Sequence, residues 1–278
     1  MTLPNFIIVG AMKAGTTTLA NMLSEHPQIF IPNNEVHYFN RDEHFLQGIN
    51  WYQKQFQEAS QETVIGEKTP TYSYLPKVPE RIYQEFPTIK LIWLFREPVS
   101  RTYSNYWHAV RARKEHLSFE QAIEKESERI KSNLMYGYVK RSIYVEQVKR
   151  YLEFFPKENM HFIVMEELLS NPRSVLEKSL LFLDVDTDKE IPLSHQNKTS
   201  SSSQIQIDRF PWITKKLHHY FPKSDWLFLH KLNSKLNAKS ITPHPIKPET
   251  QKQLKEHFKP FNNELSAIIE KDLSIWNT

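Results

Sequence analysis

Short hydrophobic runs alternate along the first two thirds of the chain with segments whose apolar positions repeat as on one face of a helix. The runs predict strands buried in a parallel sheet, at residues 6–9, 64–68, 90–95 and 161–164. The periodic segments predict helices, at residues 16–25, 77–86, 99–113 and 172–183. Because strands alternate with helices, we expect an α/β fold. Its central parallel sheet would be flanked by helices in three α/β/α layers.

The chain shows neither an internal repeat nor a convincing linker, so we predict one domain over residues 1–278. Residues 119–155 are charged and helical in pattern, and a helical C-terminal part is expected from about residue 210. The serine-rich stretch 197–204 predicts a flexible loop.

Composition narrows the class of protein. Hydrophobic residues make up 39% and charged residues 24% of the 278, which is typical of a globular protein. The mean hydropathy is −0.58, and no apolar run approaches the ~20 residues of a membrane span. Cysteine is absent, which excludes disulfides and cysteine nucleophiles and predicts a reducing compartment, the cytoplasm. The net charge of +4 is too weak to indicate a nucleic-acid partner.

Two of the five glycines, Gly10 and Gly15, bound a single loop between the first strand and the first helix. Their spacing is that of the nucleotide P-loop, but Thr16 stands where that motif has lysine, and the lysine lies inside the loop as Lys13. The loop is either an ordinary tight turn or a phosphate cradle at a helix N-terminus. The cradle would use Lys13 against the charge of a leaving group, with backbone N–H groups and hydroxyls from Ala14, Gly15, Thr16 and Thr17.

A second candidate phosphate contact follows the strand at 90–95. Arg96 stands at the carboxyl end of that strand, the edge at which open α/β sheets bind ligands, and Ser104 lies about two helical turns further on. Arg96 and Ser104 would hold a second phosphate together. The alternative is a surface ion pair of Arg96 with Glu97 and an ordinary helical serine.

These two elements together resemble the sulfotransferases that use 3′-phosphoadenosine 5′-phosphosulfate (PAPS). The residues concerned are Lys13-Ala14-Gly15-Thr16-Thr17 and the pair Arg96 and Ser104. The resemblance implies a P-loop-like fold, a first loop for the 5′-phosphosulfate and a second element for the 3′-phosphate. It extends to the heparan sulfate 3-O-sulfotransferase branch through residues 34–39, 48–52, 67–72, 76–81 and 141–144, and weakly to a further PAPS contact at Lys239.

The resemblance also implies the acid–base residues. Glu35 occupies the position of the catalytic base, which takes the proton of an acceptor hydroxyl. His37, two residues on in a segment expected to be extended, would face the same side and position the acceptor or tune Glu35. Lys68 would contact the sulfonate or the carboxylate. Without the resemblance, Glu35 could be solvated surface, His37 a structural histidine, and Glu67 with Lys68 an ordinary ion pair.

The sequence therefore predicts a metal-independent O-sulfotransferase of bacterial origin that acts on a carbohydrate or another hydroxyl-bearing acceptor. Asn40 stands where the glycan enzymes often carry an acid, which leaves the acceptor open, and the oligomeric state is also open. His108 and the pair His218 and His219 lack a second ligand at metal spacing. Two other interpretations are a P-loop-type kinase, which Thr16 opposes, and a binding module that has lost catalysis.

Overall fold

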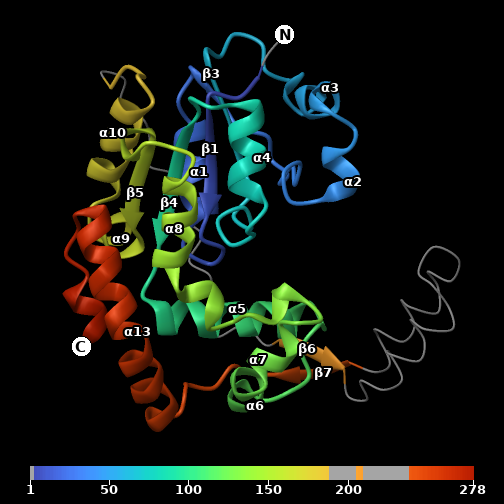
Figure 1. Ribbon diagram of the computed structural model, residues 1–278, viewed down its shortest axis with the longest axis vertical. Coiled ribbons are helices and arrows are strands. Elements are labelled where there is room, and N and C mark those ends of the chain that lie inside the picture. The colour runs from blue at the N-terminus through green and yellow to red at the C-terminus, as the bar shows by residue number, and fades with distance from the viewer. Residues whose placement is uncertain (1–2, 188–204, 209–237) are drawn as a thin grey trace, which may run out of the picture. The chain divides into compact units, whose positions relative to one another are not determined.

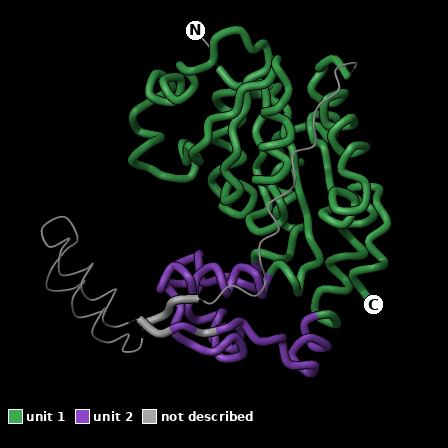
Figure 2. The backbone as a smooth tube through the Cα atoms, turned by 180° about the vertical axis from the view of Figure 1, so that it is seen from behind, with its two compact units in different colours: residues 1–101, 141–197, 255–278 green, residues 102–140, 198–254 purple. Residues whose placement is uncertain are grey.

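The computed structural model describes residues 3–187, 205–208 and 238–278, and the chain divides into two compact units (Figure 2). Unit 1 comprises residues 1–101, 141–197 and 255–278, and unit 2 comprises residues 102–140 and 198–254. The prediction of one domain over residues 1–278 stays a prediction. The serine-rich loop, His218 and His219, and residues 210–237 lie outside the described residues.

A five-stranded sheet in the order β2-β3-β1-β4-β5 forms the centre of unit 1, with every neighbouring pair parallel (Figure 1). Its strands are β1 (Phe6–Gly10), β2 (Ile29–Phe30), β3 (Val64–Lys68), β4 (Lys90–Phe95) and β5 (Met160–Val164). Four of them were predicted from hydrophobic runs, and the apolar side chains of β1 are fully buried. The sequence pattern missed β2 because a two-residue strand leaves no periodicity to detect.

Helices cover both faces of this sheet, as alternate side chains of β5 show. His161 faces α10, where its ring nitrogen contacts the Ser179 hydroxyl at 3.3 Å. The next residue, Phe162, shares the opposite face with Trp93, against which Tyr151 of α8 packs edge-on. The predicted three-layer α/β/α arrangement is therefore confirmed for unit 1.

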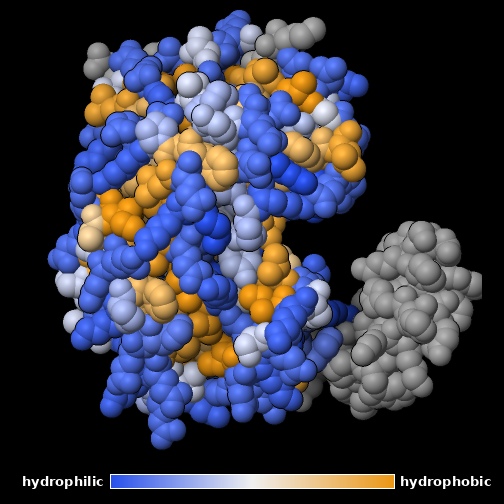
Figure 3. Space-filling view, in the orientation of Figure 1, coloured by the Kyte–Doolittle hydropathy of each residue, from blue (hydrophilic) through white to orange (hydrophobic). Residues whose placement is uncertain are grey.

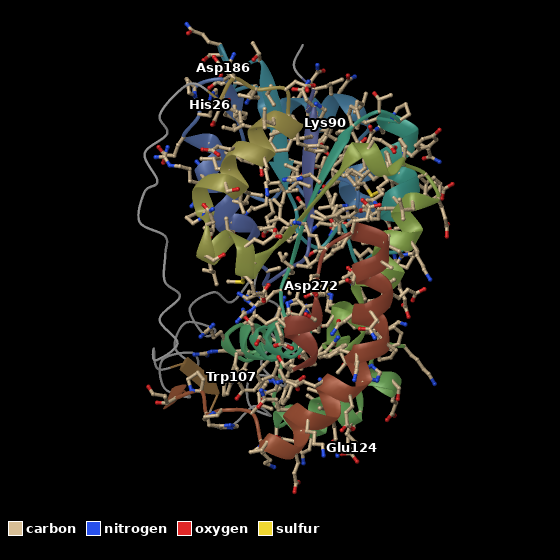
Figure 4. The ribbon with its side chains drawn as sticks, turned by 90° about the vertical axis from the view of Figure 1, so that its left-hand side faces the viewer. His26, Lys90, Trp107, Glu124, Asp186 and Asp272 are labelled. Atoms are coloured by element: carbon tan, nitrogen blue, oxygen red, sulfur yellow. The ribbon has the colours of Figure 1, made fainter. Side chains whose placement is uncertain are left out.

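The helices of unit 1 are α1 (Thr16–Ser24), α2 (Asp42–Phe45), α3 (Ile49–Gln53), α4 (Val78–Glu85), α8 (Tyr144–Leu152), α9 (Met165–Ser170) and α10 (Pro172–Phe182), with 3₁₀ turns η1 (Lys54–Phe56), η4 (Lys157–Asn159) and η5 (Ser274–Asn277). They include the predicted ones, at α1, α4 and α10, and three short helices that were not predicted, α2, α3 and α9. The ends of α1 and α10 meet on one side of the sheet, where the His26 ring contacts the Asp186 carbonyl at 3.1 Å (Figure 4). On the face shown in Figure 3, hydrophilic residues surround several separate hydrophobic areas.

Unit 2 combines short helices with a two-stranded antiparallel sheet. Its elements are α6 (Phe119–Glu124), α7 (Glu126–Arg129), η2 (Leu134–Tyr136), β6 (Ile205–Asp208) and β7 (Ala238–Ile241). Three elements extend across the unit boundaries, namely α5 (Pro98–Arg111), η3 (Lys140–Ser142) and α13 (Pro248–Ile269). Ser118 and Gln121 form a capping box at the start of α6, which explains why the helix begins there. The helical pattern predicted for residues 119–155 is confirmed.

Candidate active site

The loop between β1 and α1 has the features of an anion site. Gly15, immediately before the helix, adopts a φ of 94°, a left-handed conformation that favours glycine. No side chain among the described residues caps α1, and its first turn contains no acidic residue. The first N–H groups of a helix have no intrahelical acceptor, so they remain available to a bound anion.

One expected donor in this loop is already engaged. The Ala14 N–H donates to the Ala11 carbonyl at 3.1 Å and closes the turn. The Ala14 N–H is therefore engaged within the loop in this structure, and the roles of Ala14, Gly15, Thr16 and Thr17 toward a phosphate stay predictions. Lys13 also adopts a positive φ of 73°, which costs energy in a residue with a side chain.

Arg96 lies beside this loop. The strand order places β1 next to β4, and the chain continues from β1 toward one edge of the sheet and from β4 toward the other. Open α/β sheets bind ligands at the carboxyl ends of two such neighbouring strands. Arg96 follows β4 directly, and its guanidinium donates to the Lys13 carbonyl at 3.4 Å.

The predicted alternative for Arg96, an ion pair with Glu97, is not what the structure shows. Both carboxylate oxygens of Glu97 instead accept from the N–H groups of Val99 and Ser100 and cap α5. Ser104 lies on α5 and Lys239 on β7, both in unit 2, and their roles toward a phosphate stay predictions.

Glu35, His37 and Lys68 come together as the sequence analysis expected. The His37 Nε2 atom lies 3.4 Å from one carboxylate oxygen of Glu35, and the Lys68 Nζ atom lies 3.8 Å from the other. Lys68 also donates to the Thr17 hydroxyl at 3.2 Å, so its ammonium links Glu35 to the first turn of α1. The Glu35 side chain is 37% exposed, so it remains accessible to an acceptor molecule.

The backbone at His37 differs from the extended segment that was predicted. His37 has a φ of 57°, and its ring nonetheless reaches Glu35 while its Nδ1 atom contacts the Asn40 amide oxygen at 3.2 Å. Burial, followed by the charge of Arg41, lowers the pKa of the His37 ring, and the Glu35 carboxylate opposes this. His37 is therefore a neutral hydrogen-bonding group near pH 7, suited to positioning rather than to carrying charge.

The importance of Glu67 is not evident from the pattern of residues around it. This carboxyl is fully buried and accepts hydrogen bonds from the hydroxyls of Tyr52 (2.7 Å), Thr69 (2.8 Å) and Tyr72 (3.1 Å). The alternative considered from the sequence was an ordinary ion pair of Glu67 with Lys68, but Lys68 pairs with Glu35. An available signal was its position in a strand predicted to be buried, where a carboxylate requires donors.

Glu67 makes the stability of the fold depend on pH. Burial raises the pKa of the Glu67 carboxyl from 4.5 to about 7, because its hydrogen bonds only partly offset the desolvation. Between these two values the folded chain holds a proton that the unfolded chain has lost, so the free energy of unfolding falls as the pH rises. Burial raises the pKa of Tyr52 and Tyr72 well above 10, so neither titrates in this range.

We expect the Glu67→Gln variant to lack this component of the pH dependence. The free energy of unfolding of the wild type, relative to that of the variant, should fall by on the order of 2–3 kcal/mol between pH 4.5 and pH 7. Urea unfolding of both proteins at intervals across this range measures the difference. Parallel curves would contradict the burial of a titrating carboxyl at this position.

Other candidate residues have structural roles or stand apart. Tyr52, Tyr106 and Trp107 are buried core aromatics, whereas Trp51 is half-buried and packs on Tyr38 and His44. A cluster of basic residues lies in unit 2 and consists of Arg111, Arg113, Lys114 and His116.

Within residues 3–187, 205–208 and 238–278, no three His, Cys, Asp or Glu residues are placed to hold a metal ion. No helix in the described part of the chain is long and apolar enough to cross a membrane.

Comparison with known proteins identifies the family. The family model described as "Sulfotransferase domain" matches residues 3–260, which is most of the chain and includes segments of both units. The chain belongs to the sulfotransferase family. The family resemblance that was based on the Lys13–Thr17 loop and on Arg96 with Ser104 is confirmed. The P-loop-like α/β fold class that this resemblance implied is confirmed as well.

Two curated relatives of this chain are sulfotransferases by name. Mouse heparan sulfate glucosamine 3-O-sulfotransferase 5 is 35% identical over 188 residues, which cover 66% of this chain and 54% of the mouse protein. Membrane-associated sulfotransferase kil1 of Dictyostelium discoideum is 28% identical and covers 66% of this chain and 56% of its own length. The chain thus spans about half the length of these curated relatives.

Solved structures agree with the fold. A sulfotransferase from Alicyclobacillus acidocaldarius superposes with a TM-score of 0.75 over 100% of both chains at 29% identity. The sulfotransferase domain of the curacin biosynthetic pathway, at 20% identity and a TM-score of 0.52, shares the fold.

Proposed function

We propose that this sulfotransferase transfers the sulfuryl group of PAPS to a hydroxyl of an acceptor, with Glu35 as the general base and without a metal ion. The observation that carries the proposal is the position of the Lys68 ammonium. It lies 3.2 Å from the Thr17 hydroxyl at the start of α1 and 3.8 Å from the Glu35 carboxylate. The Lys68 ammonium thus lies between a helix N-terminus that can bind an anion and a carboxylate that can act as a general base.

The residues present fit a phosphosulfate donor. The start of α1 offers N–H groups and two threonine hydroxyls, Lys13 supplies a positive charge within the same loop, and Arg96 lies beside it. PAPS supplies an activated sulfuryl group joined to phosphate through a bridging oxygen.

Each side chain then has a definite task in an in-line displacement. The Glu35 carboxylate takes the proton of the acceptor hydroxyl as its oxygen bonds to sulfur. The bond between sulfur and the bridging oxygen breaks, and the electron pair stays on the departing 3′-phosphoadenosine 5′-phosphate (PAP). Lys13, Lys68 and the helix start stabilise that negative charge. Neutral His37 accepts from or donates to the acceptor and fixes its orientation.

A glycan hydroxyl is the acceptor that we propose. The support is the 35% identity to a protein named heparan sulfate glucosamine 3-O-sulfotransferase 5. Asn40, which contacts His37, stands where that branch often carries an acid, and this difference keeps lipid and small-metabolite hydroxyls as alternatives. A P-loop-type kinase remains disfavoured because Thr16 occupies the lysine position of that motif.

The experiment that tests the proposal follows radioactive sulfur from ³⁵S-labelled PAPS to acceptors, in buffer that contains EDTA. Acceptors would include desulfated and N-sulfated heparan polysaccharides, neutral polysaccharides and a panel of lipid and small alcohols. Labelling of a polysaccharide supports the whole proposal, and labelling of a lipid or small alcohol alone moves the acceptor to that class. Absence of labelling across the panel would contradict sulfuryl transfer to hydroxyls.

Location and source stay predictions. The absence of cysteine supports a cytoplasmic location, and a bacterial origin stays an expectation from the sequence resemblance. Fractionation of the source cells with an antibody to the chain tests the location.

A further inference from the structure

The three hydroxyl groups that donate to Glu67 have a second feature in common. Each belongs to a side chain that also contacts one of the three consecutive residues from His37 to Phe39. The Thr69 hydroxyl oxygen accepts from the His37 N–H at 3.4 Å, and the Tyr72 oxygen accepts from the Phe39 N–H at 3.3 Å. The Tyr52 ring stacks on the Tyr38 ring with 4.6 Å between centroids. Glu67 thus lies behind the segment that places Glu35 and His37.

The ionised carboxylate dictates which way these hydroxyls point. A hydroxyl has one proton to donate, and a carboxylate can only accept. Because Thr69 and Tyr72 both direct their protons at Glu67, their lone pairs face the N–H groups of His37 and Phe39. If the side chain at position 67 donated a proton instead, at least one of these hydroxyls would have to turn its own proton away from it. That proton would then point toward the backbone N–H of His37 or Phe39, and the hydrogen bond there would be lost.

The backbone at His37 depends on such support. Its φ of 57° lies in the left-handed region, which costs a residue with a side chain about 1–2 kcal/mol. Strained conformations persist where their surroundings hold them on several sides. The contact of Thr69 with the His37 N–H and the contact of Tyr72 with the Phe39 N–H are two such supports.

We propose that Glu67 is a positioning residue that, through the hydroxyls of Thr69 and Tyr72, holds Glu35 and His37 in place against Lys68. Glu67 and Lys68 are neighbours on β3, so their side chains leave opposite faces of the strand. Lys68 reaches Glu35 directly, and Glu67 acts on the same segment through the backbone. The effect on turnover rests on the proposed function above, whereas the effect on the backbone does not.

The Glu67→Gln variant tests this proposal at pH 8, where the wild-type carboxyl is mostly ionised. The glutamine amide keeps the volume and replaces one accepting oxygen by a donor. We expect hydrogen exchange at the His37 or the Phe39 amide to be at least about tenfold faster. We also expect kcat to fall about tenfold or more, while the dissociation constant for PAP stays within about twofold.

Two further variants separate positioning from general stability. Thr69→Val preserves shape and removes the acceptor of the His37 N–H, so it should reproduce the faster exchange and the lower kcat even if Glu67→Gln folds poorly. Glu115→Gln is the matched control, because Glu115 is also a buried carboxylate that accepts from a tyrosine hydroxyl, Tyr138, at 2.7 Å, but it lies in unit 2. It should lower the melting temperature and leave exchange at His37 and Phe39 unchanged.

Unchanged exchange at both amides in Glu67→Gln and Thr69→Val would overturn the proposal whatever the activity. A loss of kcat that simply follows the melting temperature in all three variants would overturn it as well. Faster exchange in a protein whose wild type transfers no sulfuryl group would refute the proposed function and leave the backbone role of Glu67 standing.

Discussion

The Glu35→Gln variant is expected to lose turnover by about 10²–10⁴-fold, because glutamine cannot take the proton of the acceptor hydroxyl. The substitution preserves volume, and the amide offers an oxygen to Lys68 and an NH₂ group to the neutral His37 ring, which lie 3.8 and 3.4 Å from the two carboxylate oxygens. The donor contacts at the start of α1 are untouched, so the dissociation constant for PAP should stay within about threefold. Steady-state transfer of ³⁵S, together with calorimetric binding of PAP, measures both quantities.

A matched control is available close to Glu35 in the sequence. Glu43, on α2, is an exposed carboxylate, and Glu43→Gln should keep the wild-type kcat. If Glu35→Gln retained turnover, another group would have to be the base. If it lost PAP binding instead, Glu35 would be structural.

Much of the fold could be predicted because parallel strands that are buried on both faces read as continuous apolar runs. The run at β4 is six residues long and was located with its bounds, and the periodic segments located α4, α5 and α10. The order of the strands could not be read in this way. It depends on which strand pairs with which, a long-range property that gives β1 its place between β3 and β4.

In the candidate site, too, the features set by local sequence could be predicted and those set by long-range contacts could not. The loop with Lys13 and Gly15 is a local pattern, and the sequence located it. The closeness of Glu35 and His37 was expected from an extended backbone, yet the structure achieves it through a left-handed residue that is not glycine. No local rule predicts that conformation at a histidine, because tertiary contacts hold it.

The Glu67 cluster shows the same limit more clearly. Its donors come from positions 2, 5 and 15 residues away in sequence, and the fold alone brings their hydroxyls to one carboxylate. The pattern Glu67-Lys68 looks like an ion pair, whereas the strand sends the two side chains to opposite faces. A charged residue in a run predicted to be buried was the sign that it has specific partners.

The nucleotide selectivity of the loop is the second prediction with a large expected effect. In the proposed site, the 5′-phosphate of PAP would bind at the start of α1 and its 3′-phosphate would bind Arg96 and Ser104. ADP lacks the 3′-phosphate, and ATP in its magnesium complex relies on the lysine that Thr16 replaces. A charge-assisted contact to the 3′-phosphate contributes about 1.5–3 kcal/mol, so PAP should bind more than tenfold more tightly than ADP.

The most direct test of the account is thermal unfolding with PAP, ADP and ATP, each with and without Mg²⁺. At a hundred times its dissociation constant, a ligand raises the free energy of unfolding by about 2.7 kcal/mol. For a chain of this size that corresponds to a rise in melting temperature of about 5–10 °C. We expect this rise with PAP, independent of Mg²⁺, and a rise at most about half as large with ADP or ATP at the same concentration, because a tenfold weaker ligand raises the free energy of unfolding by only about 1.4 kcal/mol. A rise with ATP and Mg²⁺ that exceeds the rise with PAP would contradict it.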